Sequence, residues 1–248
     1  MALSDDELER YARHIVLPQV GGAGQNRLKA ARVAVVGAGG IGSAVIPALA
    51  GAGVGRLTII DDDRVEPANL HRQPLFGEAD VGAPKAELAG AFVRRRNRFV
   101  EVAAVCRRIG TGNADQLLAG HDLVLDGSDN FATRLAVSDA CVTLAVPLIS
   151  AAAIQFQGQV GLFRARPCYR CFVGDAFDAD DCDSCAELGV LGALTGTVGS
   201  LAALIAIHAI VGIGEDPAGK VHLFDAERLQ WRTVKIPPDA ACKACAAA

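Results

Sequence analysis

The stretch that decides the fold reads Val33-Ala34-Val35-Val36-Gly37-Ala38-Gly39-Gly40-Ile41-Gly42. Its first four residues are apolar and mostly β-branched, so they predict a buried strand. Its last six satisfy the spacing G-x-G-x-x-G, and residues 43–52 after them predict a helix. Glycines at these positions permit a tight turn, let a phosphate approach the backbone N–H groups, and let the helix pack closely on the strand. A glycine turn in this context predicts nucleotide binding rather than a purely structural turn.

The surrounding sequence predicts an α/β fold with a Rossmann-like, mostly parallel sheet and flanking helices. Further strands are expected at 57–60, 101–106, 122–125 and 146–150, with helices from 84 and from 130 between them. Shorter strands at 160–163, 221–224 and 231–234 predict an antiparallel extension. A helix over 5–15 and a glycine-rich turn at 21–24 precede the first strand. We expect a single domain over 1–248, with a nucleotide-binding half (1–163) and an appended half (164–248).

Composition limits the class of protein. The 248 residues are 51% hydrophobic, which indicates that the core is not small. The formal net charge is −4, which does not indicate a nucleic-acid partner. The basic run at 94–98 is typical of a solvated helix end. The first ten residues are acidic and contain no apolar signal segment, which indicates a cytoplasmic protein. The apolar stretch 188–212 is interrupted by glycines and favours a buried helix over a membrane span.

Polar residues near the expected strand ends favour ATP over a dinucleotide. Asp61 ends the second strand, where an acid can bind ribose hydroxyls. Arg72 and Lys85 follow and can contact phosphate oxygens. Asp126 and Asp129 leave the strand at 122–125, and paired carboxylates there suit Mg²⁺ on a triphosphate. An NAD-dependent oxidoreductase is the first rival interpretation, and it assigns no role to Asp129.

These motifs together resemble the ThiF/MoeB/HesA family, the bacterial relatives of the ubiquitin-activating enzymes, and the resemblance covers nearly the whole chain. It is carried by the glycine loop and by the following segments: Arg10-Tyr11-Ala12-Arg13-His14-Ile15, Asp61-Asp62-Asp63, Asn69-Leu70-His71-Arg72-Gln73, Gly82-Ala83-Pro84-Lys85, Asp126-Gly127-Ser128-Asp129-Asn130 with Arg134, and two widely spaced Cys-x-x-Cys pairs.

The resemblance implies an ATP-dependent adenylyltransferase. Members of the family bind MgATP, and the C-terminal Gly-Gly carboxylate of a ubiquitin-like sulfur carrier attacks the α-phosphate to give an acyl-adenylate and pyrophosphate. A carboxylate is already ionised at neutral pH, so no general base is needed. Whether the carrier serves molybdopterin or thiamine synthesis stays open, although residues 150–159 lean towards molybdopterin.

The resemblance also assigns roles to residues. It implies that Gly40 and its neighbours hold phosphate, that Asp61 holds the ribose, and that Asp129 holds Mg²⁺ beside Asn130. The residues implied to hold the triphosphate are Asn69, Arg72, Gln73 and Lys85. Arg13 matches an arginine that reaches the ATP of the other subunit, which implies a homodimer; the alternative is an ordinary ion pair with an acid on its own helix.

Two Cys-x-x-Cys pairs, Cys168 with Cys171 and Cys242 with Cys245, predict a zinc knuckle. Four thiolates give a closed tetrahedral site, which is typical of structural zinc. Redox pairs, or thiols without metal, are the alternatives. A zinc site formed by the two pairs would tie the C-terminal tail to the appended half of the domain.

A third pair, Cys182 and Cys185, leaves two roles open. By resemblance, Cys185 matches a cysteine that some members link covalently to the carrier. The acidic residues around it raise a thiol pKa, which favours an inert loop thiol. The pair can also act as a redox couple or compete for zinc. Cys106 and Cys141 have apolar neighbours and are expected in the core.

Two further interpretations stay open. The first is adenylation of a small or tRNA-borne carboxylate, for which the chain lacks a broad basic surface. The second is a zinc scaffold that binds the carrier without turnover, which predicts carrier binding that does not depend on ATP.

Overall fold

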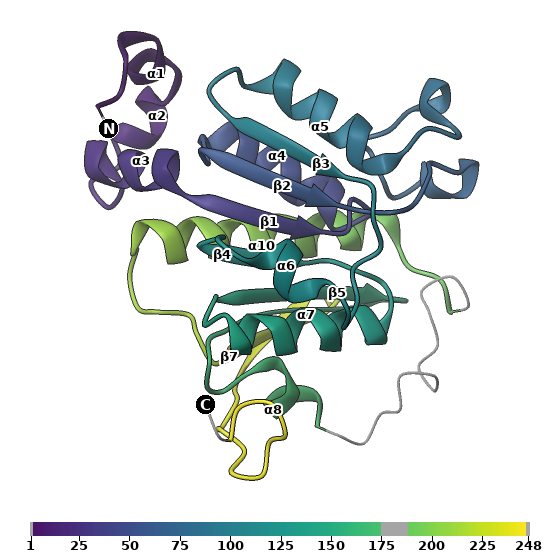
Figure 1. The fold of residues 1–248 in the computed structure, drawn as a ribbon. Coiled ribbons are helices and arrows are strands. Elements are labelled where there is room, and N and C mark those ends of the chain that lie inside the picture. The colour runs from purple at the N-terminus through teal and green to yellow at the C-terminus, as the bar shows by residue number, and fades with distance from the viewer. Residues whose placement is uncertain (1, 175–187, 247–248) are drawn as a thin grey trace.

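The computed structural model describes residues 2–174 and 188–246. One eight-stranded sheet runs through them in the order β3-β2-β1-β4-β5-β6-β7-β8 (Figure 1). The first five strands in this order are parallel and the last three pairings are antiparallel. The strands are β1 (Arg32–Val36), β2 (Arg56–Ile60), β3 (Glu101–Val105), β4 (Leu123–Asp126), β5 (Leu148–Ile154), β6 (Gln157–Phe163), β7 (Lys220–Asp225) and β8 (Gln230–Lys235). The predicted α/β class with its antiparallel extension is confirmed.

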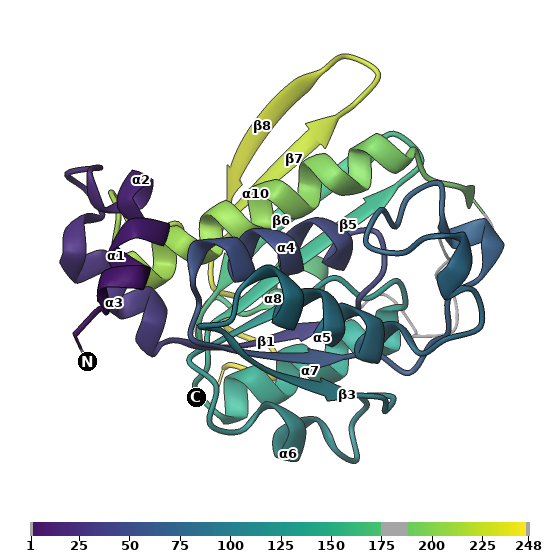
Figure 2. The ribbon, with the colours of Figure 1, turned by 90° about the horizontal axis from the view of Figure 1, so that it is seen from above.

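Helices cover both faces of the sheet (Figures 1 and 2). One face carries α4 (Gly42–Ala52), α5 (Lys85–Arg96) and α10 (Gly192–Val211). The other carries α6 (Ala114–Leu118), α7 (Phe131–Thr143) and α8 (Tyr169–Val173). Two 3₁₀ turns, η1 (Pro67–Asn69) and η2 (Glu78–Asp80), lie between β2 and α5. Three short helices, α1 (Asp5–Arg10), α2 (Ala12–Ile15) and α3 (Gly21–Ala30), precede β1.

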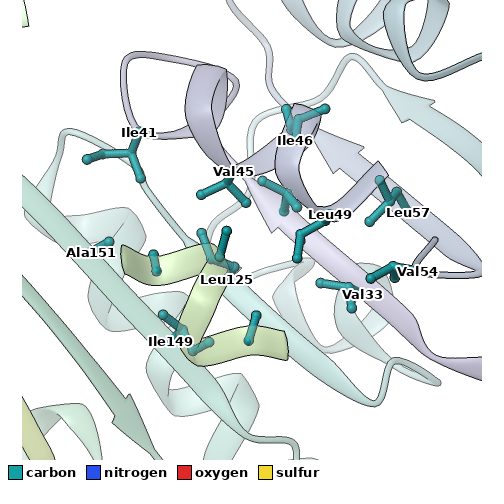
Figure 3. Packing of buried hydrophobic residues seen from close by; sticks show 14 of the residues in the cluster. Val33, Ile41, Val45, Ile46, Leu49, Val54, Leu57, Leu125, Ile149 and Ala151 are labelled. Carbon is teal, nitrogen blue, oxygen red and sulfur yellow. The ribbon is translucent and has the colours of Figure 1, made fainter. Parts of the chain in front are cut away.

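Strand β1 explains why both faces are covered. Its side chains alternate, so that Val33 and Val35 enter one core cluster while Ala34 and Val36 enter the other. In the larger cluster, Leu49 of α4 and Ile149 of β5 contribute to the packing (Figure 3). A strand that is buried on both faces consists of a continuous run of apolar residues, and this run predicted β1 from the sequence.

Helix α10 is apolar around its whole circumference because it packs within the domain. By length and composition it is long enough to cross a membrane, but half of its most apolar window is buried. It contacts α3, α4, β5 and β6. Its glycines allow close approach: a Cβ at Gly199 would lie 2.6 Å from the Ile41 carbonyl oxygen, and one at Gly192 would lie 2.4 Å from that of His71. The expected buried helix is therefore observed.

Several predicted elements differ in the structure. Residues 21–24 form the start of α3 rather than a turn, because Gly24 lies against Val211 of α10 and Gln25 donates to the Ala52 carbonyl at 2.9 Å. Tertiary packing here outweighs the low helix propensity of glycine. The predicted helix 5–15 is interrupted at Tyr11, whose hydroxyl accepts from the Asn97 amide at 2.8 Å. The strand predicted at 146–150 is observed as β5, which begins later and is longer than predicted.

One core prediction is wrong. Cys141 is buried on α7, as expected, but Cys106 is exposed. It follows β3, an edge strand of the sheet, where three of the five strand residues are exposed. Apolar neighbours in the sequence do not reveal that a strand lies at an edge.

Alanine substitutions at two glycines of α10 test the close packing of this helix. Gly199→Ala places a methyl group 2.9 Å from the Ala44 Cβ as well as against the Ile41 carbonyl, so we expect a loss of about 1–3 kcal/mol in the free energy of unfolding. Gly196→Ala on the same helix meets nothing within 4 Å, and we expect a gain of up to about 1 kcal/mol from helix propensity. Urea unfolding of both variants measures the difference. Equal effects would show that the approach of α10 to α4 is not tight.

Candidate functional site

The glycine loop between β1 and α4 builds one wall of a cavity. Gly37 has φ +89° and donates its N–H to the Ile60 carbonyl at 2.9 Å. A Cβ at Gly42 would lie 2.2 Å from the Gly37 carbonyl oxygen, so these two glycines close the turn itself. Gly39 and Gly40 instead line the cavity. Gly37 also lines the cavity, so three of the four predicted glycines face the site and Gly42 alone serves only the turn.

The cavity has a volume of about 280 Å³ and lies at the carboxyl ends of β1, β2 and β4. This edge, on either side of β1, is the crevice in which parallel α/β sheets bind ligands. Nine of the residues named from the sequence line it: Gly37, Gly39, Gly40, Asp61, Asn69, Arg72, Gln73, Lys85 and Asp129. Seven different chain segments meet here, so only the fold brings them together.

Asp61 is fixed at the mouth of the cavity by backbone donors. The Ala38 N–H donates to one carboxylate oxygen at 2.7 Å, and the Asp63 N–H donates to the other at 2.8 Å. Burial raises the pKa of Asp61, and these two N–H groups oppose the shift. The carboxylate is therefore held in one orientation, as a group that accepts two hydroxyls requires.

Cations line the same cavity. Lys85 is only 5% exposed, and its ammonium group lies 2.9 Å from an Asp63 carboxylate oxygen. The Arg72 guanidinium donates to the Ala68 carbonyl at 2.8 Å. The side-chain oxygen of Gln73 is buried without a hydrogen-bond partner among the described residues. Two cations beside an unpaired buried amide fit a polar, anionic ligand.

A second, smaller cavity of about 180 Å³ adjoins the first and shares Gly37, Asp61, Asp63 and Asp129 with it. Its walls include three buried apolar residues, Val36, Ile60 and Ile109. Asn130 lines this cavity rather than the larger one, and its side chain caps α7 by accepting from the Thr133 N–H at 2.9 Å. The two cavities together form one site whose lining is largely polar and charged, with an apolar patch in the smaller compartment.

Three predicted residues lie elsewhere. Gly42 belongs to the turn, as described above. Arg13 lies on α2 and lines neither cavity; α1 to α3 stand where β1 begins, at the end of the strands opposite the arrowheads (Figure 1). Cys185, like Cys182, lies outside the described residues.

Other residues of the cavity were not assigned from the sequence. They include Asp63, Arg64, Glu66 and Thr195. The sequence shows Asp63 as the third acid of the run 61–63, but it does not show that Asp63 pairs with Lys85. Thr195 gave no sequence signal, because it sits among small apolar residues and reaches the site only through the packing of α10 against the loop at 71–72.

Four cysteines form a separate cluster. The sulfur atoms of Cys168, Cys171, Cys242 and Cys245 all lie within 4.8 Å of one another. Cys168 lies 3.6 Å from Cys242, and Cys171 lies 3.4 Å from Cys245. Four thiolates around a tetrahedral zinc ion would be about 3.8 Å apart at the usual Zn–S distance. The donor set and the spacing therefore fit a closed, structural metal site.

The thiols of this cluster differ in their protonation. Burial raises the pKa of Cys168 and of Cys245. Burial also acts on Cys242, but N–H donors from Cys245 and Ala244 outweigh it and lower the pKa of that thiol. Cys242 therefore loses its proton more readily than Cys168 and Cys245, and a bound metal ion would displace the protons of its ligands.

The fold and the site define a nucleotide-binding α/β protein of the Rossmann-like class, with charged groups for a phosphate chain and a structural cysteine cluster. The ThiF family model matches residues 11–244, and the chain belongs to this family. The family predicted from the sequence motifs is thus confirmed.

Curated relatives match nearly the full length. A sulfur carrier protein adenylyltransferase of Thermus thermophilus is 44% identical over 252 residues, covering 99% of this chain and 93% of the relative. A molybdopterin-synthase adenylyltransferase of Salmonella typhimurium is 42% identical over 246 residues, covering 98% of each chain. A SAMP-activating enzyme E1 of Haloferax volcanii is 42% identical, and the match covers 99% of this chain and 91% of the relative.

Among solved structures, Escherichia coli MccB with ATP has a TM-score of 0.82 to this chain. The match covers 98% of this chain and 75% of that one at 24% identity. At this identity the likeness concerns the fold alone, and it supports the strand order described above.

Proposed function

We propose that the protein is an adenylyltransferase that uses ATP to activate the C-terminal Gly-Gly carboxylate of a ubiquitin-like sulfur carrier. The observation that carries this proposal is the cavity that joins the glycine loop to Arg72, Lys85 and Asp129. The names of the full-length relatives, adenylyltransferases of a sulfur carrier and of molybdopterin synthase, agree with it. The thiol chemistry of the cysteine cluster supports a cytoplasmic location, because thiols stay reduced there.

The two compartments suit the two ends of ATP. We place the adenine in the smaller one, against Val36, Ile60 and Ile109, and the ribose at Asp61 between the two compartments. The triphosphate then lies along Gly39 and Gly40, towards Arg72 and Lys85. Backbone N–H groups at the start of α4 add a favourable field for the phosphates. Asn69 and Gln73 complete the polar wall of this compartment.

The reaction needs positioning and charge stabilisation rather than a base. A carboxylate oxygen of the carrier attacks the α-phosphorus, the bond from this phosphorus to the bridging oxygen breaks, and pyrophosphate leaves with the electron pair. The products are an acyl-adenylate and pyrophosphate, and no proton is transferred. Lys85 and Arg72 stabilise the charge that moves onto the leaving group. Asp129 would hold Mg²⁺, which supplies further charge neutralisation there.

The active unit proposed here is a homodimer in which Arg13 serves the partner's site. Helix α10 links the two ends of the sheet: Thr195 lines the cavity, and Val211 packs on α3. The part of this helix from Thr195 to Val211 spans about 24 Å at 1.5 Å per residue. An arginine near the α3 end therefore cannot reach the cavity of its own chain. Val16, beside α2, is 69% exposed, as expected for a residue at a subunit contact.

We assign zinc to the four-cysteine cluster. Sulfur ligands in a closed tetrahedral arrangement select zinc among the common divalent ions, and no open position is left for catalysis. The role of the site is to fix α8 and the C-terminal tail against the sheet. Asp239 contacts the cluster only through its backbone, by donating its N–H to the Cys171 sulfur at 3.4 Å, and is not a ligand in this assignment.

ATP–pyrophosphate exchange with Mg²⁺ and candidate carriers ending in Gly-Gly tests the reaction. Exchange is expected only with a carrier whose terminal carboxylate is intact, because this group is the nucleophile. Asp129→Asn is expected to reduce the rate at least about 100-fold, through lost charge stabilisation. Asp115→Asn, at an exposed position on α6, is the matched control and should not change the rate.

Different failures of the exchange experiment have different meanings. ATP binding without exchange for any carrier would contradict carrier adenylation and favour a small carboxylate. ATP-independent carrier binding without exchange would favour a scaffold. Binding of NAD in place of ATP would contradict the whole assignment of the cavity.

Mixing two inactive variants tests whether Arg13 acts across the dimer. Arg13→Ala and Asp129→Asn should each be inactive alone, but a mixed dimer has one site in which both groups are present. Random subunit exchange makes half of the dimers mixed, so about a quarter of the wild-type exchange rate should return. No recovery, in a mixture shown by mass spectrometry to contain mixed dimers, would place Arg13 outside the reaction.

Zinc content and thermal unfolding test the cysteine cluster. Cys245→Ser is expected to lower bound zinc from about one ion per chain to none and to lower Tm by at least about 5 °C. Cys106→Ser removes an exposed thiol outside the cluster and should change neither quantity. Zinc retained at full stoichiometry in Cys245→Ser would contradict the ligand set and point to Cys182 or Cys185 as a replacement.

A further inference from the structure

Lys85 occupies a position that is unfavourable for a cation. It is the first residue of α5, and this helix has no side-chain cap at its N-terminus. The N-terminal end of a helix carries a positive field, which favours an anion and disfavours an ammonium group. Lys85 is also buried, and a buried ammonium group without an anionic partner is costly. The start of α5 therefore requires an anion beside Lys85.

In the structure this anion is the carboxylate of Asp63. One of its oxygens lies 2.9 Å from the Lys85 ammonium nitrogen, and both residues line the larger cavity. Asp63 also lines the smaller cavity. The ion pair therefore lies inside the proposed nucleotide site, so a polyphosphate that enters the larger cavity meets an ammonium group that already has a partner.

Backbone pairing builds this contact. Two short segments, one after β2 and one before α5, run antiparallel to each other, and the Val65 N–H donates to the Ala83 carbonyl at 3.0 Å. The Lys85 N–H donates to the Asp63 carbonyl at 2.9 Å. The Asp63 N–H donates to the Asp61 carboxylate at 2.8 Å. The backbone of Asp63 is thus held on both sides, and its side chain is the part that can move.

The side chain of Asp63 can leave Lys85 more easily than Lys85 can leave the cavity. It is 63% exposed, and its carboxylate has no hydrogen-bond partner other than Lys85 among the residues that the structure describes. A carboxylate that turns into water regains its hydration. Phosphate oxygens can then take its place, because they pair with the ammonium group and suit the positive end of α5.

We propose that Asp63 is a positioning residue that acts as an internal substitute for phosphate: it holds Lys85 in the free protein, competes with polyphosphate for the ammonium group, and pairs with Lys85 again as pyrophosphate leaves. Binding of ATP or of pyrophosphate has to break the ion pair, so the pair lowers the apparent affinity for both. It thereby promotes release of a highly charged product. The exchange makes and breaks no covalent bond. The inference rests on the nucleotide site proposed above.

Asp63→Asn tests the exchange, because it removes the charge and keeps the shape of the side chain. The Kd for MgATP and the Kd for pyrophosphate with Mg²⁺, measured by titration calorimetry, are both expected to fall about threefold to tenfold. A merely structural role predicts the opposite sign, because a distorted site binds more weakly. AMP lacks the β- and γ-phosphates that Lys85 serves, so its Kd should change by less than about twofold.

Two further variants control for charge. Asp63→Glu keeps the carboxylate and should leave each Kd within about twofold of the wild-type value. Glu78→Gln removes one negative charge from η2, on the same connection between β2 and α5, at an exposed residue that lines neither cavity. It should not change either Kd. Where Asp63→Asn fails to fold, Asp63→Ser also removes the carboxylate and should lower the Kd for pyrophosphate in the same way.

Thermal unfolding gives a readout that involves no catalysis. Without ligand, Asp63→Asn leaves the buried Lys85 without its anion, so Tm is expected to fall by about 2–4 °C. Saturating pyrophosphate with Mg²⁺ supplies the missing anion. The Tm of the variant should then return to within about 1 °C of the wild-type protein under the same conditions.

The outcomes separate this inference from the proposed function. A wild-type protein that binds no MgATP contradicts the proposed function. A wild-type protein that binds MgATP, with an equal or higher Kd for MgATP and pyrophosphate in Asp63→Asn, overturns the exchange and leaves the proposed function intact. An equal gain in affinity for AMP would show a general effect of charge and would also overturn it.

Discussion

The site depends first on the contact between the backbones of Gly37 and Gly42. Only 2.2 Å separates the Gly37 carbonyl oxygen from the position that a Cβ at Gly42 would take. This approach turns the chain from β1 directly into α4, so that Ala38 faces Asp61 and the amides of Gly39 and Gly40 face the cavity. A second glycine contact, between Gly199 of α10 and the Ile41 carbonyl, fixes the loop from behind.

Two charged groups of the cavity, Lys85 and Asp61, have partners before a ligand binds. Lys85 rests on Asp63, and Asp61 rests on two backbone N–H groups. A buried ammonium without a partner would be costly, and Asp63 is 63% exposed, so it can turn to solvent when phosphate replaces it. The fold can therefore hold cationic side chains at the site with little loss of stability.

Local sequence predicted the residues whose role follows from their neighbours. The glycine spacing, the acid at the end of β2 and the paired cysteines each carry their meaning within a few residues, and the structure brings these groups together in the cavity and in the cluster. Gly21–Ala30 and Cys106 were misjudged because one depends on packing against α10 and the other on the place of β3 at the sheet edge. The place of Thr195 and the pairing of Arg170 with Asp139 depend on segments far apart in sequence, which no local pattern encodes.

The antiparallel extension explains how this Rossmann-like sheet carries the four-cysteine knuckle. Strand β6 returns from β5 and ends at Phe163, directly before the knuckle, and β8 ends shortly before Cys242. Because β6 and β8 both run away from the nucleotide edge, the two cysteine pairs meet near the end of the sheet where the parallel strands begin. The cluster therefore cannot take part in chemistry at the cavity directly. Helix α7 contacts both regions: Asp139 pairs with Arg170 of the knuckle, and Arg134 donates to the Ser128 carbonyl beside the cavity.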